Sequence, residues 1–141
     1  MPQESVSQQQ TTEQRRAKAA WTAVGSVPSA SRDSYGSIIK KAPAMILTNG
    51  LAQALAFMRA KAAHKAGKPP SVENQAHLNA YNHISHWVMG EAFGRQQNDE
   101  MLLEELTNRD SNDYRLATTE TLAYMNWLKR FVEARGLGEG E

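Results

Sequence analysis

The apolar residues of this chain recur every three or four positions over long stretches, which is the spacing of amphipathic α-helices. The first such stretch begins at about Thr12 and carries an apolar series: Ala17, Ala20, Trp21, Val24 and Val27. No segment shows the strict alternation that is typical of a half-buried strand, and no internal repeat is visible. The pattern predicts an all-α fold, a single compact bundle of about five to six helices.

Capping and breaking residues set the predicted helix boundaries. Ser31 or Asp33 can cap a short second helix toward Lys41, and Pro43 fits the first position of a third helix. The segment AGKPPS ends that third helix near Ala66. Three further helices are predicted: one capped by Ser71 and running toward Gly90, a short acidic one in NDEMLLEELTN, and a last one from about Asp113 to Arg135 that Ser111 or Asn112 opens.

Two signals compete in KKAPAMILTNGLAQALAFMRAK, residues 40–61. Asn-Gly between apolar residues is a strong hairpin signal, but the flanking residues do not alternate and are good helix formers. We therefore predict one central helix through Gly50, with this glycine allowing another backbone to approach closely. The expected core stripe and its neighbours are Ile46, Leu47, Leu51, Ala54, Leu55, Phe57, Met58 and Ala62.

The predicted domain covers residues 11–136, with a disordered tail over 1–10 and a flexible tail over 137–141. The chain has no cysteine, so disulfides and thiolate metal sites are excluded. Its first residues lack the pattern of a signal peptide, and no apolar run reaches the roughly 20 residues that span a membrane. A soluble, cytoplasmic protein is expected.

The small net charge of +1 hides a strong asymmetry along the chain. Residues 15–68 contain ten basic residues and one acidic residue, a net charge of +9, whereas residues 69–141 carry −6. Such asymmetry is typical of a nucleic-acid surface on one side of a protein. A fold that interleaves the two halves would cancel it, and the sequence leaves both interpretations open.

No constellation of residues indicates catalysis. His83 and His86 lie three residues apart on a predicted helix, but no third metal ligand accompanies them and His77 points elsewhere. The acidic cluster of Asp99, Glu100, Glu104 and Glu105 is typical of the solvated face of a helix. We therefore expect no enzyme activity, no catalytic residue, no cofactor and no metal.

The last helix, YRLATTETLAYMNWLKRF, is predicted to be two-faced. The residues predicted to face the core recur at helical spacing and are Tyr114, Ala117, Thr121, Tyr124, Met125, Leu128, Phe131 and Val132. Arg115, Lys129 and Arg130 lie outside this face and are of the type that contacts phosphates.

Three motifs follow one another along the chain: RRAKAAWTAV, NGLAQALAFMRAK and YMNWLKRF. In this order they resemble the small helical subunit of the type III-B CRISPR RNA-guided effector, the Cmr complex. The resemblance extends from about Gln14 to Ala134. It implies a helical bundle without catalytic activity that stacks in several copies along the guide RNA and its paired target RNA. The implied partners are the other Cmr subunits, copies of itself and both RNAs, with a monomer or weak associator when isolated.

The motif matches place Lys18, Asn49, Gln53, Lys61, Lys129 and Arg130 within the family pattern. Charge adds further residues to the expected RNA-binding set, namely Arg15, Arg16, Lys40, Lys41 and Arg59. Phosphate contacts of this kind bind RNA of any sequence.

Two alternatives remain. A free-standing DNA-binding helical regulator would place a short turn before a polar recognition helix, but the basic segment from Arg32 to Lys41 leads into a helix predicted to be buried. The other alternative is a helical protein–protein adaptor without RNA contact.

Overall fold

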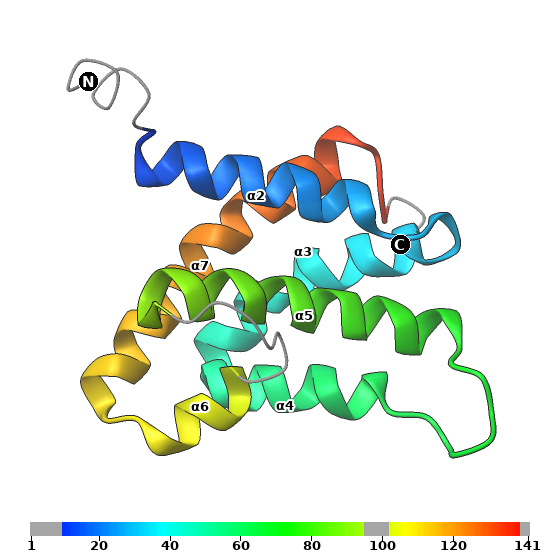
Figure 1. Cartoon of the computed structure of the whole chain (residues 1–141). Helices are drawn as coiled ribbons and strands as arrows, with labels where there is room; N and C mark the ends of the chain where they lie inside the picture. The colour runs from blue at the N-terminus through cyan, green and yellow to red at the C-terminus, as the bar shows by residue number, and fades with distance from the viewer. Residues whose placement is uncertain (1–9, 95–101, 139–141) are drawn as a thin grey trace.

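A computed structural model of the chain describes residues 10–94 and 102–138 (Figure 1). Within these residues there are six α-helices, one 3₁₀ turn and no strand. The elements are α2 (Thr12–Ser26), η1 (Ser29–Ser31), α3 (Arg32–Asn49), α4 (Leu51–Ala62), α5 (Val72–Phe93), α6 (Leu102–Asn108) and α7 (Ser111–Ala134). The predicted all-α bundle of five to six helices is confirmed.

Helix α5 is the centre of the bundle. It packs against α3, α4, α6 and α7, while α2 packs mainly on α7. Figure 1 shows α4 and α5 side by side, joined by the loop at residues 63–71. The largest fully buried side chains come from α3, α4, α5, α6 and α7, including Tyr35, Leu51, Tyr81, Leu102 and Leu128. One continuous core therefore underlies all the long helices.

Side-chain caps hold the helix ends where the sequence places polar residues. Ser71 caps α5 in a capping box with Asn74, as predicted. Thr11 forms a second capping box at the start of α2. Helix α7 begins at Ser111, two residues before the predicted start at about Asp113, because the Asp110 carboxylate accepts a hydrogen bond from the Asp113 amide and so becomes the cap. Helix α5 passes the predicted end at Gly90 and stops at Gly94, which adopts the left-handed conformation.

The predicted boundary between a short second helix and a third helix at Pro43 is wrong. Helix α3 runs from Arg32 to Asn49 with Pro43 inside it. An internal proline removes one helical hydrogen bond and costs about 3 kcal/mol. The cost is outweighed by packing, because Ile39, Ala42 and Ile46 are buried at helical spacing on both sides of the proline.

The prediction of one helix through Gly50 is also wrong. Gly50 has φ 92° and ψ 158°, so α3 ends there and α4 begins at the next residue. This backbone conformation is essentially restricted to glycine. Among the described residues, no second backbone lies within 4 Å of a Cβ placed at this position, which would lie 3.3 Å from the Tyr114 hydroxyl oxygen. Helix α4 also ends earlier than predicted, at Ala62 rather than near Ala66.

We expect Gly50→Ala to lower the free energy of unfolding by about 1 to 2 kcal/mol, because any Cβ strains a left-handed backbone. Chemical denaturation measures this difference. Gly67→Ala tests strain without crowding, since Gly67 also has positive φ but open space around it in the loop after α4, and it should show a similar loss. A loss seen with Gly50→Leu but not with Gly50→Ala would contradict strain and favour simple overpacking.

Several side chains of the predicted core stripe lie at the surface. Leu47 is 73% exposed and Phe57 is 42% exposed, whereas Leu51, Leu55 and Met58 are buried as expected. The break at Gly50 explains the exposure of Leu47, because it interrupts the helical phase that related this residue to those of α4.

The acidic segment forms the short helix α6. Glu104 is exposed, while Glu105 is half-buried and accepts a hydrogen bond of 2.7 Å from Arg109. The prediction of a fully solvated acidic face therefore does not hold for Glu105. Asp99 and Glu100 lie outside the described residues.

The predicted flexible tail differs from the structure in its first residues. The Leu137 amide donates to the Val132 carbonyl at 3.0 Å, and the Gly138 amide donates to an Asp33 carboxylate oxygen at 3.2 Å. These bonds place residues 137 and 138 against the start of α3. Residues 1–9 and 139–141, where the remaining tail predictions fall, lie outside the described part of the chain. No helix in the described ranges combines the length and the apolar character needed to cross a bilayer.

Candidate nucleic-acid interface

The structure distributes the predicted RNA-binding residues over separate regions of the surface. Arg15, Arg16 and Lys18 of α2 lie at two ion pairs and a pocket. Lys41, Gln53 and Lys61 lie around the Phe57 ring, whereas Arg59 faces α5. Arg130 of α7 lies beside α2. The basic residues of the first half of the chain therefore do not form one continuous positive surface in the described structure.

Two of the predicted RNA-binding arginines are engaged within the bundle. The Arg15 guanidinium donates to both carboxylate oxygens of Glu91 at 2.9 and 2.8 Å. These hydrogen bonds lower the pKa of Glu91 and raise that of Arg15. Arg16 donates to both oxygens of Glu120 at 2.7 and 2.8 Å, and its side chain is only 16% exposed. Acidic residues of the second half of the chain thus neutralise both arginines, as the interleaved-charge interpretation anticipates.

The residues of α3 and α4 form a surface that we call the α3–α4 basic surface, made of Lys41, Gln53, Phe57 and Lys61. Gln53, Phe57 and Lys61 are exposed on successive turns of α4. The Lys61 ammonium lies 5.6 Å from the centroid of the Phe57 ring. Lys41 and Phe57 line a common groove of about 290 Å³ between α3, α4 and α5, together with His77.

The remaining basic residues of this part of the chain lie around the same helices. Lys40 is half-buried next to Lys41 on α3, and Asn49 is exposed at the end of α3. Arg59 is separate: its guanidinium lies 5.1 Å from the centroid of the Tyr81 ring, so it faces α5.

Sequence reasoning missed Phe57 as a surface residue, because it placed the ring beside Ile46 and Ala54 on one widened apolar face. The available signal was its spacing of four residues from both Gln53 and Lys61, which puts all three on one helical face. An exposed aromatic ring beside lysines is an arrangement that nucleic-acid-binding proteins use for contacts to bases or sugars.

Lys129 and Arg130 are exposed on α7. Arg130 borders a shallow hollow together with Trp127 and Glu13, and the Trp127 indole donates to Glu13 at 2.7 Å. Arg130 therefore lies next to α2 rather than on the α3–α4 basic surface.

The histidines take part in packing contacts. The Tyr35 hydroxyl and His83 Nδ1 lie 2.8 Å apart, and His83 Nε2 lies 3.3 Å from the Ser26 hydroxyl. Burial raises the pKa of Tyr35 well above its ordinary value, so the phenol is neutral near pH 7. Across residues 10–94 and 102–138 there is no group of three or more His, Asp or Glu side chains able to hold a metal ion.

Comparison with known proteins identifies the family. The family profile described as CRISPR-associated protein (Cas_Cmr5) matches residues 12–135. The chain is also similar to the X-ray crystal structure of a CRISPR-associated Cmr5 family protein from Thermus thermophilus, with 26% sequence identity and a TM-score of 0.69. That similarity covers 89% of this chain and 97% of the other. Since the family match spans every helix from α2 to α7, the chain belongs to the Cmr5 family of CRISPR-associated proteins, the small helical subunits of the type III-B Cmr effector complex.

Proposed function

We propose that this chain is a non-catalytic subunit that binds the guide RNA–target RNA duplex through the α3–α4 basic surface. The observation that carries the proposal is the grouping of Lys41 and Lys61 around the exposed ring of Phe57. Lysine ammonium groups contact phosphates irrespective of sequence, which a subunit that lies along any guide must do. The Phe57 ring supports Lys61 and offers apolar contact to a ribose.

The surface is suited to binding because little of its charge is neutralised. Neither Lys41 nor Lys61 forms an ion pair with a carboxylate within the described residues. Arg15 and Arg16, in contrast, would have to leave Glu91 and Glu120 before they could contact a phosphate. We therefore place the main RNA contacts on α3 and α4 and not on the start of α2.

Several copies are proposed to stack along the duplex. The basic surface of α3 and α4 and the exposed Glu104 of α6 belong to different elements of the bundle. Contacts between unlike surfaces of successive copies build an open filament rather than a closed dimer. Partner subunits of the Cmr complex would supply cleavage of the target RNA.

The test is target RNA capture by a Cmr complex reassembled with Lys40→Ala, Lys41→Ala and Lys61→Ala combined. We expect weaker capture, with the slope of log affinity against log salt reduced by about one for each phosphate that a lysine no longer neutralises, and thus by up to about three. The melting temperature should stay nearly unchanged, because Lys41 and Lys61 are exposed, Lys40 is half-buried, and none of the three forms an ion pair within the described residues.

The charge-matched control replaces Lys65, Lys68 and Arg115, which are exposed outside the α3–α4 basic surface. It should leave capture and salt dependence close to those of the original protein. If the Lys40, Lys41 and Lys61 variant captures target normally at low and high salt, this surface does not bind RNA. A role as an adaptor between protein subunits would then replace the proposal.

A further inference from the structure

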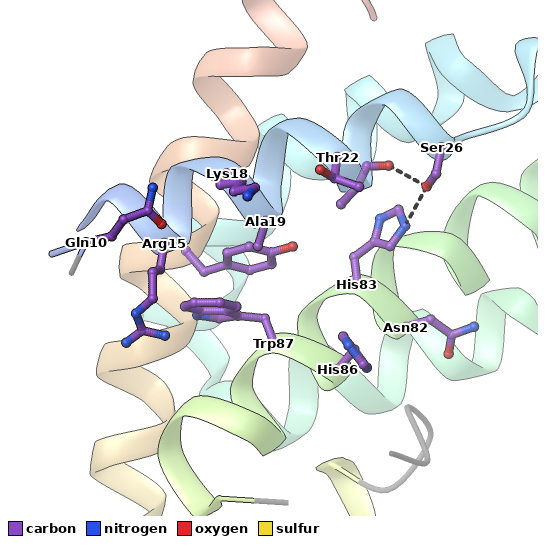
Figure 2. Close-up of a pocket in the computed structure, with 12 residues that line it drawn as sticks. Gln10, Arg15, Lys18, Ala19, Thr22, Ser26, Asn82, His83, His86 and Trp87 are labelled. Carbon is purple, nitrogen blue, oxygen red and sulfur yellow. Dashed lines mark hydrogen bonds between the residues drawn. The ribbon is translucent and has the colours of Figure 1, made fainter. Parts of the chain in front are cut away.

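A pocket of about 650 Å³ lies between α2 and α5, on a different face from the α3–α4 basic surface (Figure 2). Helix α2 packs mainly on α7, so side chains rather than helix contacts join it to α5 here. Arg15 and Glu91 form one bridge at 2.8 Å, and Ser26 and His83 form the other at 3.3 Å. We call the space between these bridges the α2–α5 pocket.

The walls of the α2–α5 pocket are flat and largely apolar. Figure 2 shows Ala19 and Thr22 on the α2 side, opposite Trp87 and His83 on α5. The Trp87 ring is stacked on Tyr124, with ring centroids 5.4 Å apart and an interplanar angle of 17°. Two small side chains facing rings leave a space that suits a planar aromatic ligand.

The rim of the pocket is cationic. Lys18 lies at its edge and forms no ion pair within the described residues. The Arg15 guanidinium lies 5.8 Å from the centroid of the Trp87 ring, but Glu91 neutralises it, so Lys18 supplies the positive charge of the rim. Asn82 adds an amide whose buried oxygen has no hydrogen-bond partner in the described part of the chain. The pocket therefore combines an aromatic wall, positive charge and a hydrogen-bonding amide.

We propose that the α2–α5 pocket binds one unpaired nucleotide of an RNA chain. Its base lies against the α2 wall and the stacked rings of Trp87 and Tyr124, and its phosphate lies at Lys18. An apolar peptide side chain would use the aromatic wall but leave the Lys18 ammonium without a counter-charge, so the charge favours the nucleotide. A volume of about 650 Å³ is sufficient for a base with its sugar and phosphate. The inference rests on the proposed function in taking RNA as the ligand, but it concerns a separate face of the bundle.

Fluorescence of Trp87 tests this directly. The chain has three tryptophans, and the variant with Trp21→Phe and Trp127→Phe retains only Trp87 as a reporter. We expect a single-stranded hexanucleotide RNA to change this emission in a saturable way. The same oligonucleotide with all six positions abasic should bind roughly fivefold to 100-fold more weakly, the range found for loss of base–aromatic stacking.

Variants in the same background separate a pocket from a charged surface. Thr22→Tyr fills the space from the exposed face of α2 and should abolish the saturable change. Lys18→Ala should weaken binding and lower its salt slope by about one, whereas the control Lys68→Ala, in the loop after α4, should not. Circular dichroism spectra that match the background protein would exclude unfolding as the cause.

The proposed function and this inference fail in different ways. The combined Lys40, Lys41 and Lys61 variant should leave the Trp87 response unchanged, whatever it does to target capture. Equal affinities for the hexanucleotide and its abasic counterpart, or an unaltered response in Thr22→Tyr, would overturn the pocket. A free mononucleotide that saturates the signal at lower concentration than the hexanucleotide would also overturn the assignment to an RNA chain.

Discussion

Replacing Glu120 by alanine is expected to lower the free energy of unfolding by about 3 kcal/mol, the lower end of the range for breaking a buried ion pair. Glu120 is 8% exposed and joins three helices. Its carboxylate accepts two hydrogen bonds from Arg16 of α2 and one of 2.7 Å from the Trp87 indole of α5. The substitution would leave a guanidinium that is 16% exposed and an indole N–H without this acceptor.

The measurement is thermal and denaturant unfolding, and the expected fall in melting temperature is about 10 °C. Glu91→Gln is the matched control, because it breaks a similar bidentate pair with Arg15 at a position where the side chains are 42% and 23% exposed. The free energy of unfolding that this variant loses should stay below about 1 kcal/mol.

A double variant shows how much of the loss in stability comes from the charge that remains on Arg16. Combining Arg16→Met with Glu120→Gln removes the guanidinium and keeps an acceptor for Trp87. It should therefore be more stable than Glu120→Ala. A Glu120→Ala protein as stable as the Glu91→Gln protein would show that the ion pair contributes no more than a surface pair.

Replacing Gly36 by valine is expected to lower the free energy of unfolding by about 2 to 3 kcal/mol through overpacking. A Cβ on this buried residue of α3 would lie 2.8 Å from the Leu137 carbonyl carbon and 2.9 Å from the Gly138 amide nitrogen. Because both are backbone atoms, the C-terminal segment has to move as a whole. That movement breaks the hydrogen bond of 3.2 Å between Gly138 and Asp33.

The same close approach predicts that the effect of Gly36→Ala on the free energy of unfolding changes sign in a shortened chain. After deletion of residues 137–141, Gly36→Ala should raise the free energy of unfolding by about 1 kcal/mol, because alanine favours a helix interior and the opposing backbone is gone. In the full chain Gly36→Ala should not stabilise. Urea unfolding of the four proteins compares the two backgrounds, and stabilisation by alanine in both would contradict close packing of residues 137 and 138 on α3.

The fold class, several helix ends and the family were accessible from sequence because they depend on local chemistry. Ser71 illustrates this, since a hydroxyl that accepts an amide hydrogen bond acts on neighbours within one turn. The apolar spacing in the last helix likewise predicted Tyr124, Met125 and Leu128 as core residues, and they are buried. The three motifs resembled the family that the comparisons show.

The break at Gly50 and the continuity at Pro43 were decided by packing. Each position carried two opposing local signals of similar size, a few kcal/mol at most. Burial of Ile39, Ala42 and Ile46 on α3 is compatible with a helix through Pro43, and Leu51 starts a new buried stripe after Gly50. Non-local burial therefore outweighed the local preferences.

The α3–α4 basic surface, which we propose binds RNA, also depends on tertiary structure. The sequence by itself determined that the first half of the chain is basic, but not which charges stay available. Glu91 and Glu120, distant in sequence, pair with Arg15 and Arg16, while Phe57 is exposed beside Lys61. Charge interacts through space over several ångströms, so the sum along a segment does not determine the field at a surface. Only the folded arrangement of the helices determines which cations meet a carboxylate and which stay without one at the described surface.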